Sequence, residues 1–211
     1  MKLGEIKLEA LKLMFANVET DLYLEHIELY KQDEAYRDYL ANMPGAINRC
    51  FASIEEKRIL PCKWYEVGGE DTDARILRLD MDALVNDFLD IHRIVYENDR
   101  GEYISDIEFR REGNRIVLSA IGCGEKYVVL YHPTIPRVTI ATEEDRELPI
   151  PDSIAAHIPY YVKGDLFRVD EPNEAGEARN WYEAAMDAIQ SKTEGRVTKV
   201  KSVYAQTEGE A

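Results

Sequence analysis

The sequence predicts an α+β fold, in which a helical body carries an inserted small antiparallel β unit and ends in an extended C-terminal tail. Apolar residues recur at spacings of three and four up to residue 60 and again from residue 148, as on the buried faces of helices. Between these parts the spacing changes to two, with Gly- and Asn-containing turns, as in antiparallel strands. We therefore predict a helical body of residues 1–60 and 148–192, an inserted β subdomain of residues 61–147, and a flexible C-terminal arm of residues 193–211.

Three helices are expected in the first 60 residues. Residues 4–15 alternate charged and apolar groups and predict an amphipathic helix that is apolar on more than one side. Residues 20–41 carry a mixed aliphatic and aromatic stripe among many acids. Met43-Pro44-Gly45 is expected to interrupt the chain, because proline breaks a helix interior. Helical spacing then resumes from Ala46 to the basic end at Lys57-Arg58, where cations suit a helix C-terminus.

The segment after Leu60-Pro61 has the pattern of strands joined by tight turns. Glu112-Gly113-Asn114 predicts a hairpin, because Gly and Asn tolerate positive φ. The expected strands are Arg75–Leu79, Ile91–Tyr96, Tyr103–Arg110, Arg115–Ala120, Tyr127–Tyr131 and an edge strand at Val138–Ala141.

The stretch Leu148–Ile189 predicts two helices joined by a short acidic elbow. Pro149 and Pro151 impose an extended approach, and Asp152 can cap the first helix. The segment Asp170–Asn173 interrupts the helical spacing, which then resumes. On pattern alone, this stretch is typical of a helical hairpin made for packing.

The composition excludes some classes of function. The 211 residues include 41 acidic and 26 basic side chains, a formal net charge of −15. Binding a nucleic-acid backbone needs clustered Lys and Arg, so we expect no such binding, although DNA can slide past an acidic surface without sticking. No apolar run reaches the length of about 18 residues typical of a membrane helix, and Met1–Phe15 lacks the pattern of a signal peptide.

The sequence contains no recognisable catalytic or metal-binding motif. Cys50, Cys62 and Cys123 are odd in number and show no CxxC spacing, which indicates reduced thiols in a cytosolic protein. No serine lies in GxSxG, and Gly122–Lys126 lacks the P-loop spacing. We therefore predict no enzyme activity, no metal and no cofactor, while acid–base pairs assembled from distant segments stay open. The histidines occupy no ligand spacing and are expected to be structural; they are His26, His92, His132 and His157.

Aromatic residues are abundant in helices whose faces are too mixed to serve one core alone. Such residues are enriched at subunit interfaces, where they bury large areas. The alternative is a single core with ordinary exposed tyrosines. The candidates for packing between subunits are Tyr160, Tyr161, Phe167, Trp181 and Tyr182.

The C-terminal arm is basic and β-branched in an otherwise acidic chain. It is either a frayed terminus or a segment that orders on a partner, for example by adding a strand. The candidate partner-binding residues are Arg196, Val197, Lys199, Val200, Lys201, Val203 and Tyr204.

Several pieces of the sequence occur in an order that is typical of one known family. They are the helix Leu3–Phe15, the helix start Pro44-Gly45-Ala46-Ile47-Asn48-Arg49, the strand Ile91–Tyr96, the two-strand unit Asn114–Tyr131 ending in His132-Pro133, Leu148–Asp152 leading to Pro159-Tyr160-Tyr161, and the Asp170-Glu171-Pro172 elbow followed by Arg179-Asn180-Trp181-Tyr182. This layout resembles the head-to-tail adaptor (connector) proteins of tailed bacteriophages and prophages.

The resemblance implies a structural virion protein of the phage neck. Identical subunits would form a ring, commonly dodecameric, below the portal protein, which joins the capsid to the tail and extends the DNA ejection channel. The implied partners are the portal protein and a stopper or tail-completion protein, with genomic DNA passing through without specific binding and with no membrane. The implied location is the virion neck, and the host cytoplasm during assembly. The arm would reach the portal.

Two alternatives stay open from the sequence. Within the virion, the chain could be a tail-completion or stopper protein, which would share the small β unit but normally has less helix. Outside that class, it could be a small acidic cytosolic enzyme or binding protein.

Overall fold

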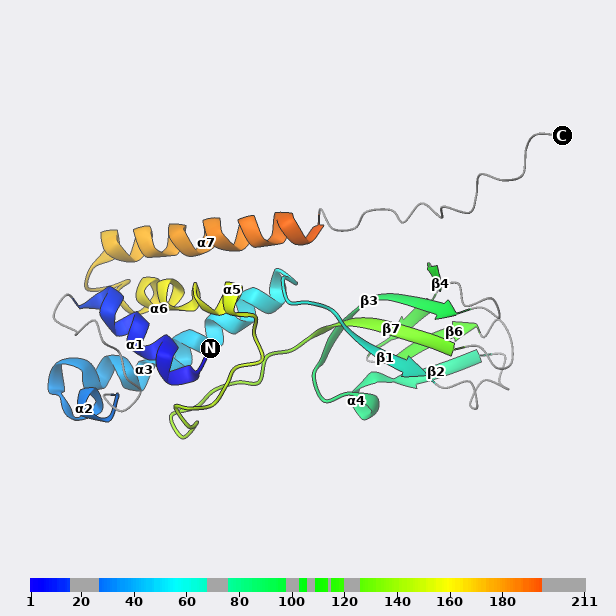
Figure 1. Ribbon diagram of the computed structural model, residues 1–211, viewed down its shortest axis with the longest axis horizontal. Helices are drawn as coiled ribbons and strands as arrows, with labels where there is room; N and C mark the ends of the chain where they lie inside the picture. Colours follow the sequence, from blue (N-terminus) through cyan, green and yellow to red (C-terminus); the bar gives the residue numbers. More distant parts are fainter. Residues whose placement is uncertain are drawn as a thin grey trace.

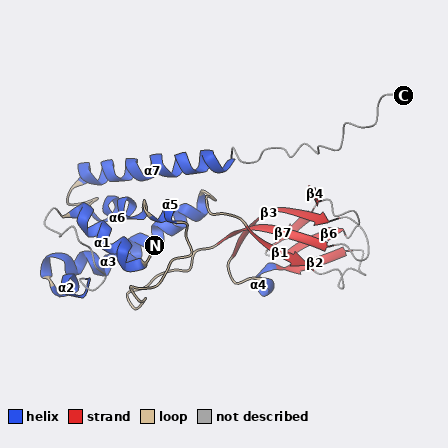
Figure 2. Cartoon of the chain, viewed as in Figure 1, coloured by secondary structure: helices blue, strands red, loops and turns tan. Residues whose placement is uncertain are grey.

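Helices and strands are separated into two bodies along the long axis of the molecule (Figures 1 and 2). The computed structural model describes residues 1–15, 27–67, 76–97, 103–105, 109–113, 115–119 and 126–194. The α+β class and the insertion of a small antiparallel β unit between helical segments are confirmed. The predicted arm lies, from residue 195, outside the described residues. The helices of the helical body are α1 (Leu3–Met14), α2 (Ile27–Gln32), α3 (Glu34–Glu56), α5 (Asp152–Ala155), α6 (Ile158–Leu166) and α7 (Pro172–Glu194).

Helix α1 lies at the centre of the helical body. Its Leu3, Ile6 and Leu11 side chains are fully buried, because α1 packs against both α3 and α6. Lys7 is also buried, and its Nζ donates to Glu144 at 2.8 Å. A helix that is apolar on more than one side needs neighbours around it, and this one has them.

The β unit consists of two antiparallel sheets that share one core. The first sheet has the order β1-β7-β3-β4 and the second has the order β2-β6-β5. Val129 and Tyr127 of the first sheet and Ile116 of the second are fully buried in this common core. The elements are β1 (Lys63–Val67), β2 (Ile76–Asp80), α4 (Met81–Leu84), β3 (Phe88–Glu97), β4 (Tyr103–Ser105), β5 (Phe109–Glu112), β6 (Arg115–Ser119) and β7 (Lys126–Pro133).

The helical predictions need two corrections before residue 60. Pro44 does not interrupt the chain, because α3 runs through it. Its neighbours Met43, Ala46 and Ile47 are fully buried, and this packing outweighs the local cost of proline. The single helix expected at 20–41 is also wrong: the described part contains α2 and the start of α3, separated where the Asp33 side chain accepts from the backbone N–H of Ala35 at 2.9 Å and caps α3.

Of the six predicted strands, four are confirmed and two are wrong, and one further strand was missed. Strands β2, β3, β6 and β7 lie where expected, and Gly113 adopts a φ of 64° in the predicted hairpin. The expected strand Tyr103–Arg110 is split into β4 and β5, which belong to different sheets. Strand β1 was not predicted, and the expected edge strand Val138–Ala141 does not form.

Residues 134–147 return along the helical body instead of extending the β unit. Ile135 and Val138 are buried in the core cluster of the helices. The Asn48 side chain both accepts from the Val138 backbone N–H at 2.9 Å and donates to its carbonyl at 2.7 Å, as a neighbouring strand would. Glu55 accepts from the Ile135 N–H at 2.7 Å. Side chains of α3 therefore hold this segment where a sheet edge was expected.

Candidate functional site

Helix α7 presents an exposed tryptophan on its outward face. Figure 1 shows α7 along one side of the helical body, from the elbow at residue 172 to the end of the described chain. Trp181 is 69% exposed and, with Glu177, Asn180 and Ala184, lines a shallow hollow of about 430 Å³. Tryptophan is enriched among the residues that dominate protein–protein interfaces, so Trp181 is a candidate contact residue.

The opposite face of α7 is fixed to α3 and α6. Lys57 at the end of α3 pairs with Glu183 at 2.8 Å and with Asp187 at 2.9 Å. The Arg179 guanidinium lies over the Tyr161 ring, 3.8 Å from its centroid. These contacts set the rotation of α7 about its axis, and they hold Trp181 outward.

The structure divides the five aromatic residues that the sequence offered for subunit packing. Tyr161, Phe167 and Tyr182 are at most 5% exposed and lie in the core of this chain, with the Tyr161 and Tyr182 rings 4.9 Å apart edge to face. Their side chains leave no surface for a neighbouring subunit, so for these three the interface prediction is replaced by a core role. Trp181 is exposed and Tyr160 is half-buried, so these two side chains can reach a partner.

The seven residues predicted for portal binding lie outside the described residues. They are Arg196, Val197, Lys199, Val200, Lys201, Val203 and Tyr204. Their role stays a prediction from the sequence.

A cavity of about 600 Å³ lies where the two bodies meet. One wall is the C-terminal end of α3 with the chain that leaves it, and the other is the near end of the first sheet. Among the residues that line the cavity are Glu56, Arg58, Cys62, His92, His132 and Gln190.

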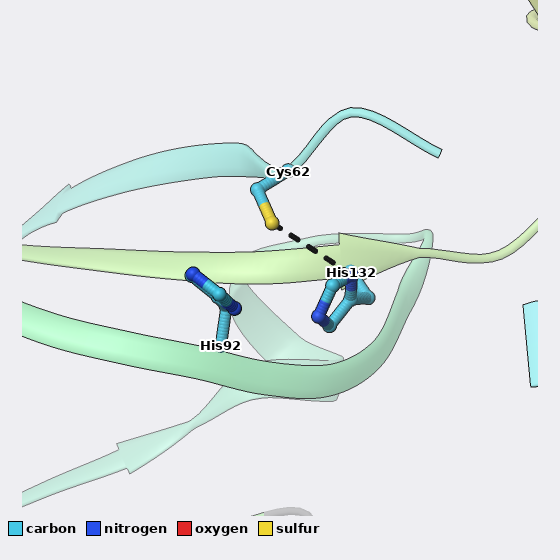
Figure 3. A group of neighbouring side chains, drawn as sticks. All are labelled: Cys62, His92 and His132. Carbon is cyan, nitrogen blue, oxygen red and sulfur yellow. Dashed lines mark hydrogen bonds between the residues drawn. The ribbon is translucent and has the colours of Figure 1, made fainter. Parts of the chain in front are cut away.

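Three potential metal ligands converge at this cavity (Figure 3). One ligand atom from each of Cys62, His92 and His132 lies within 4.8 Å of the other two. The Cys62 Sγ is 3.7 Å from Nδ1 of His132, and the two imidazole rings meet edge to face with centroids 5.3 Å apart. Cys62 precedes β1, while His92 belongs to β3 and His132 to β7, so three neighbouring strands supply the group.

Strand pairing explains why these side chains meet. Lys63 pairs with Tyr131, a core residue, so Cys62 and His132 lie opposite each other on the face away from the shared core. The pairing of β3 with β7 shifts between Ile91 and Arg93, which leaves His92 as the extra residue of a bulge. Bulges redirect side chains and are over-represented beside functional sites.

The surroundings of the cluster favour neutral imidazole and a protonated thiol. Burial, with the nearby His92 and Arg58, lowers the pKa of His132, although Asp90 acts in the opposite sense. Burial raises the pKa of the Cys62 thiol, and the charge of Arg93 opposes that rise. Neutral imidazoles carry a free lone pair, and the thiol would give up its proton to a bound metal.

No protein-family model matches the chain, and none of the curated proteins does. Among the described residues, no helix has both the length and the apolar character needed to cross a membrane.

Sequence reasoning interpreted Cys62 as a reduced thiol and His92 and His132 as structural histidines, and it missed their convergence. The three positions are separated by 30 and 40 residues, so no short motif includes them. A weak signal was present, because Cys62 follows Pro61 and His132 precedes Pro133, and both prolines mark strand ends. Only the pairing of β1 with β7, which the sequence did not predict, brings the two together.

Proposed function

We propose that this protein is a head-to-tail adaptor of a tailed bacteriophage or prophage. Identical subunits form a ring below the portal, connect the capsid to the tail and extend the channel for DNA. The order of the sequence pieces described above supports this assignment. So does the net charge of −15, which suits a channel protein that does not retain DNA.

The observation that carries the proposal is the outward-facing Trp181 on a helix whose opposite face is already fixed. Tyr182 on that opposite face is fully buried, so α7 is a core element whose other face carries Trp181 outward. In the ring, a second copy of this chain covers the surface around Trp181. A buried tryptophan at an interface typically contributes about 2 kcal/mol or more when truncated, equivalent to roughly 30-fold in affinity.

The arm is expected to contact the portal. Its basic residues Arg196, Lys199 and Lys201 suit an acidic surface, and its β-branched residues suit addition of a strand to a partner. The subunit then assembles on the portal, and the highly charged free chain can stay monomeric beforehand.

The test mixes the full chain with its cognate portal protein and measures assembly by analytical ultracentrifugation and negative-stain electron microscopy. We expect rings on the portal from the wild type, and loss of rings with Trp181→Ser while the circular dichroism spectrum is unchanged. Trp64→Ser is the matched control, because Trp64 is also 69% exposed but lies on β1, away from α7. A chain ending at residue 194 tests the arm in the same assay.

Three results would count against this proposal. A compact monomer with and without the portal contradicts a ring-forming adaptor. Rings that survive Trp181→Ser but fail with Trp64→Ser move the interface to the β unit. Binding to a preformed adaptor ring instead of the portal favours a stopper or tail-completion protein.

A further inference from the structure

We propose that Cys62, His92 and His132 form a binding site for a zinc-type divalent metal ion at the junction of the two bodies. The site does not depend on the phage assignment, because its residues and their geometry are the same for any function of the chain. It goes beyond the role of the protein in assembly.

The distance between the Cys62 and His132 ligand atoms fits a tetrahedral zinc ion. Zinc bonds of about 2.3 Å to sulfur and about 2.05 Å to nitrogen, at the tetrahedral angle, place those two atoms about 3.6 Å apart. The Cys62 Sγ and the His132 Nδ1 are 3.7 Å apart. His92, on the other side of β7, completes a set in which all three ligand atoms lie within 4.8 Å of each other.

The donor set selects the class of metal. A thiolate with two imidazoles suits zinc and similar borderline-soft ions, whereas magnesium and calcium require oxygen ligands. The Asp90 carboxylate, which acts on His132, is already paired with Arg58 and with Arg111. The described residues supply three ligand groups, and all three line the cavity of about 600 Å³, where water or a partner group could provide a fourth ligand.

A bound ion would join three neighbouring strands at the end that faces the helical body. Cys62 stands where the chain enters the β unit and His132 where it leaves, so a metal ion links the two connections at the base of the β unit. Closing so long a loop restricts the unfolded chain. The ion would therefore stabilise the β unit and its attachment to the helices.

The test uses the full chain, purified under reducing conditions and freed of metal with a chelator. Zn²⁺ is titrated in competition with a chromophoric zinc chelator, and Co²⁺ is added separately as a spectroscopic probe. We expect one tightly bound Zn²⁺ per chain, and a thiolate-to-cobalt charge-transfer band that appears with Co²⁺. Thermal melting of the β unit should shift upward with one equivalent of Zn²⁺.

Two variants identify the ligands and one serves as a control. Cys62→Ser and His92→Ala should each weaken Zn²⁺ binding by more than about 100-fold, since losing a group that merely orients a ligand already costs 10–100-fold. Cys62→Ser should also remove the charge-transfer band. His92 is exposed, so His92→Ala keeps the fold, and circular dichroism checks this. The control His157→Ala changes a half-buried histidine on the helical body and should bind like the wild type.

The proposal is overturned if wild type and Cys62→Ser bind Zn²⁺ equally, or if the wild type binds none. In the first case the metal occupies another site. In the second case the cluster is only a thiol–imidazole contact between strands.

Discussion

Gly164 lies where α6 and α7 approach each other closely, and it makes the packing of the helical body testable. A Cβ added there would lie 3.0 Å from the carbonyl oxygen of Ala175 and 3.3 Å from the backbone nitrogen of Arg179. Both are backbone atoms of α7, so no side chain can turn aside to make room. Alanine at position 164 must push the two helices apart, and overpacking of this kind costs about 1–3 kcal/mol.

Gly176 provides a matched control within the same helix pair. A Cβ added at Gly176 meets nothing within 4 Å. Gly176→Ala should therefore stabilise the chain by about 0.5–1 kcal/mol through helix propensity alone. Gly164→Ala receives a similar gain, so the difference between the two variants isolates the steric cost. We expect Gly176→Ala to be more stable than Gly164→Ala by about 1–3 kcal/mol.

Urea unfolding followed by far-ultraviolet circular dichroism measures this difference, because nearly all described helix belongs to the helical body. With a denaturant dependence of about 2 kcal/mol per molar, a cost of 2 kcal/mol lowers the midpoint by about 1 M. Equal stabilisation by both substitutions would refute the close contact of α6 with α7. Since that contact positions the face of α7 that carries Trp181, the proposed ring surface would then need revision.

Two further predictions concern the segment between the bodies and the β unit. Glu55→Ala should destabilise the chain by about 2–4 kcal/mol, because it leaves the buried Ile135 N–H without an acceptor and unpairs Arg137. The control Glu56→Ala changes the exposed neighbouring residue and should shift the urea midpoint little. Burial alone would raise the pKa of Asp87, but hydrogen bonds from Lys63 and Tyr131 outweigh it and lower that pKa below the ordinary 3.8. The stabilisation from Asp87 is therefore complete above about pH 4, and it is lost as the pH falls through the lowered pKa of Asp87 in the folded chain. Asp87→Asn should reduce the free energy of unfolding near pH 7 by up to about 1 kcal/mol. On acidification to pH 3, urea titrations should show a smaller further loss of stability for the variant than for the wild type. An acid dependence equal to that of the wild type contradicts this role of Asp87.

The elements that the sequence predicted correctly are those with a local cause. Gly113 supports its hairpin because it can adopt a positive φ. The interruption expected over Asp170–Asn173 is shorter than predicted, since α7 begins at Pro172, where proline fits the first turn of a helix. The errors arise where distant contacts decide. Pro44 stays in α3 because buried neighbours hold the helix together, and Val138 forms no strand because Asn48, 90 residues earlier, already satisfies its backbone groups.

In the candidate sites, too, contacts between distant segments determine what the sequence pattern left undecided. Trp181 and Tyr182 are adjacent, and both fit an aromatic helical stripe, so spacing did not decide which one faces the core. Tyr182 faces the core because Tyr161 and Cys50, which belong to other helices, border its ring there. The Cys62 cluster depends on strand register, including the bulge at His92, and register is a property of pairing between distant segments.

Asp90 explains how the β unit can keep a fixed attachment to the helices. Its carboxylate pairs with Arg58 at the end of α3 and with Arg111 on β5, so one side chain links the helical body to both sheets. Arg58 adopts a φ of 52°, a left-handed conformation that costs a non-glycine residue about 1–2 kcal/mol. The ion pair with Asp90 offsets part of that cost and keeps the chain turning out of α3 towards Cys62. Because His132 pairs with Asp90 in the sheet, the same contacts also place the proposed metal ligands. A metal bound there would strengthen a junction that the contacts of Asp90 already hold, and the two bodies would enter the proposed ring as one unit.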